Sequence, residues 1–345
     1  MNENQGAKLK VIDYHGFLNA EDYENMKLKL PDIMEIPAGL DSDRNTLQDY
    51  IIKIKNDKDN KFIRFYGLHT QEPYTTKMKD GEFVTGEDLE TGRMYESLVR
   101  DGKLWKDEKW VEEFIQFIVK RTEFINKETG NDHGLKYIEV HPPKTDLLND
   151  KPKNFFDYYE IFIRAIHQEL GEDVEIFMEN SNGSDHLAFS KYKGINEYAK
   201  KMREIKDRTG LKSYIALDIP LLLKSHNLKC KERDCQYSKI EKEFINIFTN
   251  LRESRDLIRS VHLWGYKGGN PHNGDLNSLF HSNENRNNDE ISKEAEDLKN
   301  ALLKNLKELL DDGKERYLLL ELNNSYAEQR ENIIKDLRGN GFQIM

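Results

Sequence analysis

The sequence predicts a single (β/α)8 (TIM) barrel covering residues 1–345, and two patterns along the chain predict it. Short apolar runs rich in Val, Ile, Leu and Tyr alternate with longer segments of helical period. Such runs are typical of parallel strands that are buried on both faces. Strands that alternate with helices favour a parallel sheet, and eight repeats of the pair favour a closed barrel over an open sheet.

Eight segments are expected to form the strands of this barrel. In chain order they are residues 10–14, 32–37, 62–68, 136–141, 174–179, 213–218, 258–264 and 316–322. Helices are clearest where apolar positions recur at three- and four-residue spacing and Lys and Glu fill the rest, in residues 107–128, 154–170 and 292–312. No linker rich in Pro, Gly or Ser and no internal repeat divides the chain, so we expect one domain. The long polar connections after the third, sixth and seventh strands are expected at the C-terminal face, where barrel active sites are built.

Composition narrows the class of protein. The net charge of −10 argues against a protein that coats polyanions generally, although it leaves room for a local basic groove. No apolar run approaches the roughly 20 residues of a membrane span, and the N-terminal residues lack the apolar core of a signal peptide. The two cysteines do not make a disulfide framework. We therefore expect a cytoplasmic protein without a membrane partner.

Ionisable residues stand at or near the C-terminal ends of six consecutive predicted strands. These residues are His69, His141, Glu179, Asp218, His262 and Glu321, and His272 follows in the loop after the seventh strand. A single such residue is explained by a hydrogen bond or a helix cap. Six of them at one barrel mouth are costly to bury without partners, which predicts a shared metal site. Three imidazoles and three carboxylates suit Zn, or else Mn or Fe, better than Ca or Mg.

Short motifs around these residues resemble those of endonuclease IV (AP endonuclease family 2) within the xylose isomerase-like TIM-barrel superfamily. The resemblance covers nearly the whole chain and is carried by the order of "EVHPP", "MENSNG", "LDIP", "VHLWG" and "LLLEL". It implies one ion on His69, His141 and Glu179. It implies a second ion on Glu179, Asp218, His262 and Glu321, with Glu179 bridging the two.

The same resemblance implies a third ion only in part. Leu221 stands where the family has a ligating His, and Asn270 stands where it has a ligating Asp. His272 keeps the last ligand of that set, and His226 is a possible substitute for the first. We therefore expect two or three divalent ions. An alternative for His226 is a separate zinc knuckle with Cys230 and Cys235, but three soft ligands at irregular spacing favour ordinary loop positions for these residues.

Two chemistries fit this set of residues. With two or three ions, the expected reaction is metal-assisted hydrolysis of phosphodiester bonds, with Glu179 as bridge and water-orienting base. With one ion, the expected reaction is that of a sugar isomerase or epimerase, in which Glu179 and Glu321 remove and return a proton. His69 and His141 discriminate between them, because a single-ion isomerase does not require both imidazoles. A multinuclear iron oxidase acting on peptides and a barrel that binds a ligand without turnover are further alternatives.

The predicted partner is a nucleic acid, or a phosphorylated or sugar small molecule. Residues 219–239, which include Lys224, carry five Lys or Arg against two acids, whereas the loop after the third strand is acidic. A mouth that is near neutral overall permits a phosphate-bearing substrate without requiring one. Asn180, beside Glu179, is a candidate substrate-binding residue. Tyr74 and Trp264 are candidates for stacking on a base or sugar ring, with packing at the barrel rim as the alternative.

Overall fold

The computed structural model describes much of the chain, including every predicted strand. The described residues are 6–14, 33–37, 64–70, 105, 108–129, 134–142, 155–180, 189–228, 237–267, 270–280, 293–322 and 327–345.

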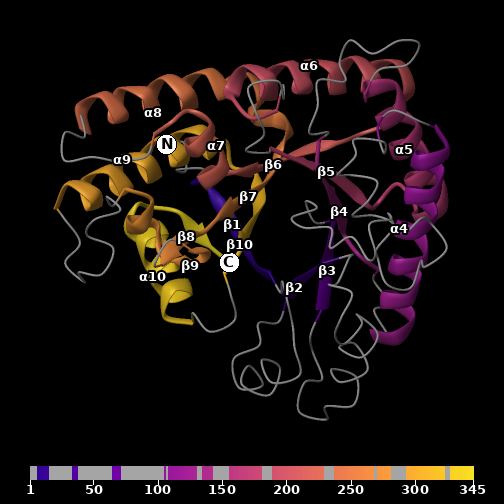
Figure 1. Cartoon of the computed structure of the whole chain (residues 1–345), viewed down its shortest axis with the longest axis horizontal. Coiled ribbons are helices and arrows are strands. Elements are labelled where there is room, and N and C mark those ends of the chain that lie inside the picture. Colours follow the sequence, from indigo (N-terminus) through magenta and orange to yellow (C-terminus); the bar gives the residue numbers. More distant parts are fainter. Residues whose placement is uncertain are drawn as a thin grey trace, which may run out of the picture.

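Eight parallel strands close into a barrel (Figure 1). They are β1 (Lys8–Tyr14), β2 (Ile33–Pro37), β3 (Arg64–His69), β4 (Tyr137–Val140), β5 (Glu175–Glu179), β6 (Tyr214–Asp218), β7 (Ile258–Leu263) and β10 (Glu315–Leu320). Each strand pairs in parallel with its neighbours, and β10 pairs with both β7 and β1, which completes the ring. A short strand, β11 (Gln343–Ile344), adds to β1. The predicted fold class is confirmed, and all eight strands lie within two residues of their predicted ends.

Helices lie at the left, top and right of the strands in Figure 1. They are α4 (Glu108–Thr129), α5 (Phe155–Leu170), α6 (Tyr192–Thr209), α7 (Ile219–Ser225), α8 (Tyr237–Leu251), α9 (Lys293–Leu310) and α10 (Ala327–Gly339). The three helices predicted from periodicity correspond to α4, α5 and α9, while the connections after β1 and β2 fall outside the described residues. No helix in the described part of the chain is long and apolar enough to cross a membrane.

An antiparallel hairpin follows β7. It consists of β8 (Gly265–Lys267) and β9 (Asn270–Gly274), and the 3₁₀ turn η2 (Leu276–Leu279) comes directly after it. The sequence predicts only a long polar loop at this position. The hairpin is the element that carries His272 back toward the end of β10, where this imidazole contacts Glu321.

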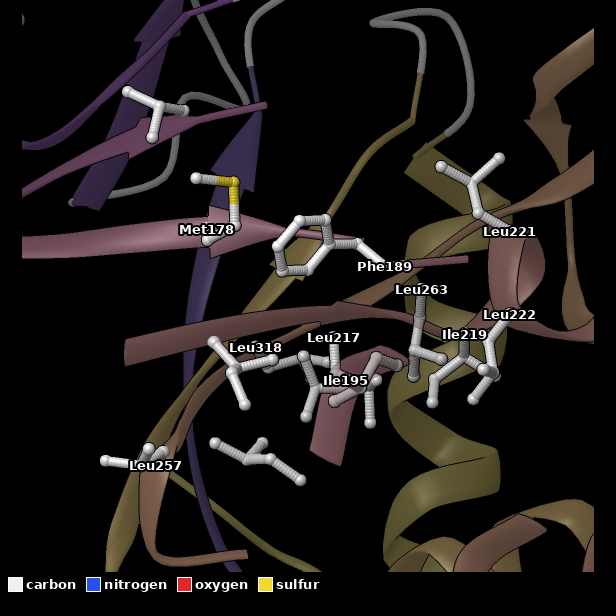
Figure 2. Packing of buried hydrophobic residues seen from close by; sticks show 14 of the residues in the cluster. Met178, Phe189, Ile195, Leu217, Ile219, Leu221, Leu222, Leu257, Leu263 and Leu318 are labelled. Carbon is white, nitrogen blue, oxygen red and sulfur yellow. The ribbon is translucent and has the colours of Figure 1, made fainter. Parts of the chain in front are cut away.

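The apolar residues form two cores because successive side chains of a strand point to opposite faces of the sheet. The outer core lies between strands and helices, and Figure 2 shows Leu263 of β7 near Ile219 and Leu222 of α7. The inner core fills the barrel below the mouth and consists of Ile12, Tyr137, Phe177, Ala216 and Leu319. These apolar side chains keep water out of the barrel floor.

The ionisable residues stand two positions after members of the inner core. Glu139 follows Tyr137, and Glu179 follows Phe177 in the same way. Asp218 and Glu321 stand likewise after Ala216 and Leu319. A spacing of two keeps the same face of the strand, so these side chains form the layer directly above the apolar floor.

Gly67 is required by the close approach of a neighbouring ring. A Cβ at this position would overlap the ring of Tyr137, whose hydroxyl donates a hydrogen bond to Glu35. We expect Gly67→Ala to lower the free energy of unfolding by about 1–3 kcal/mol, because the buried ring must be displaced. Gly339→Ala is the control, since a Cβ there meets open space. Denaturant unfolding measures both variants, and equal stability of the two would contradict the packing described.

Candidate metal centre

The strand ends bring six of the predicted residues into two groups that share one member. His69, His141 and Glu179 form the first group, and Glu179, Asp218, His262 and Glu321 form the second. Within each group one potential ligand atom per residue lies within 4.8 Å of the others, and every member is buried. This arrangement matches the predicted sets residue by residue, while their role as metal ligands stays a prediction.

The first group joins the ends of β3, β4 and β5. The Nε2 atoms of His69 and His141 are 3.1 Å apart. Glu179 Oε2 lies 3.3 Å from His141 Nδ1 and 3.7 Å from His69 Nε2. Two imidazoles and a carboxylate oxygen therefore surround a common point.

The second group joins the ends of β5, β6, β7 and β10. His262 Nδ1 lies 2.7 Å from Glu321 Oε1 and 3.8 Å from Glu179 Oε1. The side chain of His262 is fully buried. These distances show that Nδ1 faces Glu179 and Glu321, the two residues that the resemblance predicts to be catalytic.

Asp218 is held by contacts from three elements. One carboxylate oxygen caps α7 by accepting the backbone N–H of Leu221 at 2.6 Å. The other accepts the indole N–H of Trp264 at 2.7 Å. The amide of Asn180 bonds to both backbone groups of Asp218, which fixes the end of β6 against the end of β5. The carboxylate is thus oriented before any ligand arrives.

Two of the proposed substrate contacts are accordingly occupied inside the protein. Trp264 is buried and donates to Asp218, and the side-chain amide of Asn180 is used by the same residue. Contact of either with substrate stays a prediction. Lys224 lies exposed in the last turn of α7, while Tyr74 lies outside the described residues.

His272 lies at the edge of the second group. Its Nδ1 is 3.0 Å from the backbone carbonyl of Glu321 and 3.4 Å from Glu321 Oε2. Its ring centroid is 4.3 Å from that of Trp264, and its φ of 61° is in the left-handed region. A non-glycine residue with positive φ stores backbone strain, which the surrounding contacts must hold. The structure brings this imidazole to the site but leaves it outside the two groups.

The structure does not bring His226, the possible substitute ligand for a third ion, to the two groups. Leu221 is a buried member of the outer core on α7, labelled in Figure 2. His226 ends α7, stacks on Tyr192 and lies 3.4 Å from Glu243 of α8. His226 therefore faces the helical layer rather than the barrel interior. Cys230 and Cys235 lie outside the described residues.

Two glutamates of the site were missed by reasoning from strand ends. Glu35 of β2 and Glu139 of β4 form a third group with His69. Glu35 Oε1 lies 2.7 Å from His69 Nδ1, and Glu139 Oε1 lies 3.3 Å from the same nitrogen. The sequence does contain a feature that points to Glu139. It is an acidic residue inside an apolar strand, two positions before the predicted ligand His141.

Five carboxylates are buried in this layer, and their charge is the main electrostatic feature of the site. They are Glu35, Glu139, Glu179, Asp218 and Glu321. Among the described residues, their charged partners are imidazoles rather than Lys or Arg. Oxygen atoms of Glu139, Glu179 and Glu321 lie near imidazole nitrogens but make no hydrogen bond of good geometry within that set. Buried carboxylate oxygens without well-aligned donors are costly, and divalent cations are the partners that this donor set fits.

The pKa values of the acidic residues reflect this crowding. Burial, with the negative charges of Glu139, Glu321 and Asp218, raises the pKa of Glu179 well above its usual range. Burial and the charge of Glu321 raise the pKa of Asp218 to about 8. Burial opposes ionisation of Glu321 as well, but the imidazole of His262 outweighs it and lowers that pKa to about 2. In the absence of cations the site therefore retains protons on some carboxyls.

The pKa values of His69 and His262 are raised, although burial alone would lower them. Burial lowers the pKa of His69, but the charges of Glu139 and Glu35 outweigh it and raise this pKa to about 9. The pKa of His262 is raised well above its usual value, chiefly by Glu139. Protons on these rings take the place that divalent ions would fill.

The metal-free protein is therefore expected to lose stability as pH rises. A group whose pKa is raised by folding stabilises the fold below its unfolded-state pKa, and this contribution disappears as pH rises through the folded-state pKa. For Asp218 that interval runs from 3.8 to about 8, and for His69 from 6.5 to about 9. We expect the thermal midpoint in chelator to fall from about pH 6 to about pH 9, and saturating Zn²⁺ to weaken this dependence. A midpoint that stays constant or rises in chelator would contradict the assignment.

The fold and these side chains define a parallel (β/α)8 barrel with a buried carboxylate–imidazole centre at the C-terminal ends of its strands. No family model and no curated protein matches the chain.

Solved structures resemble the chain at low identity. A xylose isomerase domain protein from Planctomyces limnophilus is 12% identical, with 96% of this chain and 97% of that chain covered and a TM-score of 0.46. The IolI protein with a bound zinc atom is 13% identical, with 96% of each chain covered and a TM-score of 0.45. The probable 3-DHS dehydratase AsbF from Bacillus anthracis is 10% identical, with 96% and 98% covered and a TM-score of 0.47. Because these identities and TM-scores are low, the resemblance to endonuclease IV stays a prediction.

Proposed function

We propose that the chain is a divalent-metal-dependent hydrolase of phosphodiester bonds with a dinuclear centre bridged by Glu179. One observation carries the proposal: the two oxygens of Glu179 face different groups. Oε2 faces His141 and His69, at 3.3 and 3.7 Å, whereas Oε1 faces His262 at 3.8 Å. A carboxylate placed in this way would hold one ion with each oxygen, whereas a single-ion site would need only one of them.

The donor set indicates what such ions would do. Zn²⁺, or Mn²⁺ or Fe²⁺, held by the two groups would supply Lewis acidity that activates water and neutralises charge on phosphoryl oxygens. Glu179 lies between the groups and is placed to orient the water and to accept its proton. Asp218 is fixed by Trp264 and by the N-terminus of α7, so it keeps its orientation during turnover. The apolar floor of Tyr137 and Phe177 excludes water from below.

The charge at the mouth is compatible with a phosphate-bearing substrate. Lys224 is exposed on α7, the helix that Asp218 caps, and belongs to the basic segment 219–239. Lys and Arg side chains neutralise phosphates, so this segment favours a phosphodiester without requiring one. We infer a nucleic acid or another phosphodiester as substrate.

Hydrolysis is tested on protein purified without chelator and supplied with Zn²⁺ or Mn²⁺. The substrates are duplex DNA with one abasic site and bis(p-nitrophenyl) phosphate, which reports phosphodiester cleavage without nucleic-acid recognition. We expect metal-dependent cleavage of at least the small diester. Metal-loaded protein that cleaves neither substrate would overturn the proposal.

His69→Ala distinguishes two ions from one. We expect its kcat/KM on the small diester to fall by about 100-fold or more, because the first group loses one of its three members. His226→Ala is the matched control, since that imidazole faces α8, and it should retain wild-type activity. Retention of activity by His69→Ala would argue that the second group acts alone.

The second candidate is a sugar isomerase or epimerase with one ion. It is favoured by the completeness of the second group, in which His262 Nδ1 lies between Glu321 and Glu179, at 2.7 and 3.8 Å. Two glutamates beside one imidazole suit removal and return of a proton. One ion per chain together with isomerisation of a sugar, and no diester cleavage, would select this function.

A further inference from the structure

Glu139 lies between the imidazoles of the two groups. Its Oε1 is 3.3 Å from His69 Nδ1, and its Oε2 is 3.1 Å from His262 Nε2. The residue is fully buried in the middle of β4. Among the described residues neither oxygen makes a hydrogen bond of good geometry, and the two imidazole nitrogens are the ion-pair partners of this carboxylate.

The nitrogens that face Glu139 are the ones that face away from Glu179. His69 presents Nε2 to Glu179 and Nδ1 to Glu139. His262 presents Nδ1 to Glu179 and Nε2 to Glu139. Each ring therefore has one nitrogen toward the bridging carboxylate and the other toward Glu139. A histidine that binds a metal through one nitrogen usually donates its other N–H to a carboxylate or carbonyl.

We propose that Glu139 is a positioning residue shared by both ions: its carboxylate lies against the outer nitrogen of both rings, where it would accept the N–H of His262 and share the N–H of His69 with Glu35, and so would fix the ligating nitrogen of each. The proposal rests on the metal-binding part of the proposed function and adds a coupling between the two sites. A single carboxylate that serves one imidazole of each group sets both affinities together. A metal ligand role for Glu139 is disfavoured, because its oxygens face the outer nitrogens of both rings.

Glu35 provides a matched comparison. It lies 2.7 Å from the same nitrogen of His69, and it also accepts a hydrogen bond from the hydroxyl of Tyr137. Within the described part of the chain, its hydrogen-bond and ion-pair partners are His69 and Tyr137, and neither belongs to the second group. Glu35 should therefore act on the first ion alone, whereas Glu139 should act on both.

The test measures metal occupancy against buffered free Zn²⁺. In the wild-type background, Glu35→Gln and Glu139→Gln should each weaken the first ion by about 10- to 100-fold. In a His141→Ala background, where only the second group remains complete, Glu139→Gln should weaken the remaining ion by the same factor. Glu35→Gln should leave that ion unchanged. An unchanged affinity in Glu139→Gln, His141→Ala protein would overturn the proposal.

Two further measurements separate a positioning role for Glu139 from a structural role and from a ligand role. Because Glu139 also contacts the imidazoles of His69 and His262 in the metal-free protein, folding in chelator is compared by circular dichroism at room temperature: Glu139→Gln should keep the wild-type spectrum, and loss of the folded spectrum would indicate a structural role and overturn the proposal. A wild type that binds three ions, reduced to two in Glu139→Gln, would make Glu139 a ligand and also overturn it. If wild type binds no ion at all, the proposed function itself fails, which is a distinct result.

Discussion

Glu179→Gln is expected to lower kcat/KM for phosphodiester cleavage by at least about 10³-fold, which corresponds to about 4 kcal/mol of transition-state stabilisation. The amide presents one oxygen instead of two, so it cannot face the His69 side and the His262 side with equivalent donors. It also cannot accept a proton from water. Steady-state kinetics on bis(p-nitrophenyl) phosphate measures the loss at saturating Zn²⁺.

Glu175→Gln is the control for that substitution. It changes the same residue type on the same strand, but Glu175 pairs with Arg259 at 2.8 Å and stands at the opposite end of β5. This variant should retain wild-type kinetics. A Glu179→Gln protein that keeps its metal and its activity would remove both the bridging and the base role from the residue.

Metal binding is expected to raise the thermal midpoint by about 6 °C. Free Zn²⁺ at about 1,000 times its dissociation constant adds about 4 kcal/mol to the free energy of unfolding, and each kcal/mol shifts the midpoint of a chain of this size by about 1.5 °C. The cause is the layer of buried carboxylates, which lacks cationic Lys or Arg side chains among the described residues. Calorimetry with chelator and with Zn²⁺ measures the difference.

The same experiment on a site variant provides its control. Asp218→Asn removes one carboxylate oxygen from the second group and turns an amide NH2 toward the N–H of Leu221 or of Trp264, so its metal-free form should be less stable than metal-free wild type and its gain from Zn²⁺ should be smaller. A wild-type midpoint that does not respond to Zn²⁺, Mn²⁺ or chelator would contradict metal binding at this layer.

The barrel was predictable because several strands are nearly continuous apolar runs that alternate with segments of helical period. The runs at 136–141 and 213–218, for example, correspond to β4 and β6 within one residue at their N-terminal ends. The hairpin of β8 and β9 was not predictable, because its strands are short, polar and rich in glycine. Gly265 and Gly274 are required there by close backbone approach to Asp275 and Tyr266, a constraint that only the folded chain reveals.

The grouping of the site was predictable from strand ends, since parallel strands of a barrel bring their carboxyl ends to one face. His69, Glu179 and His262 lie together for this reason. Glu139 was not predicted because only the residues at the strand ends, such as His141, were considered as candidates. Glu139 stands two positions before His141, and side chains two positions apart point to the same face of a strand. The alternation of side chains along β4 therefore predicts that Glu139 lies in the same layer as His141.

The hydrogen-bond partners of the site residues depend on tertiary packing and could not be predicted from the sequence. Trp264 was a candidate for stacking on substrate, yet its indole N–H donates to Asp218. Asn180 was a candidate for substrate binding, yet its amide joins β5 to β6. In both residues a polar group next to a strand end forms a hydrogen bond with a residue of a neighbouring strand. Residue type alone does not distinguish this role from ligand binding.

The most direct test of a centre bridged by Glu179 is the metal content of folded chain purified without chelator. Inductively coupled plasma mass spectrometry against protein concentration should give two divalent ions per chain for wild type, and fewer for Glu179→Gln, because that residue belongs to both groups. A wild type that carries no divalent ion, or that binds only one under saturating Zn²⁺, would contradict the dinuclear centre.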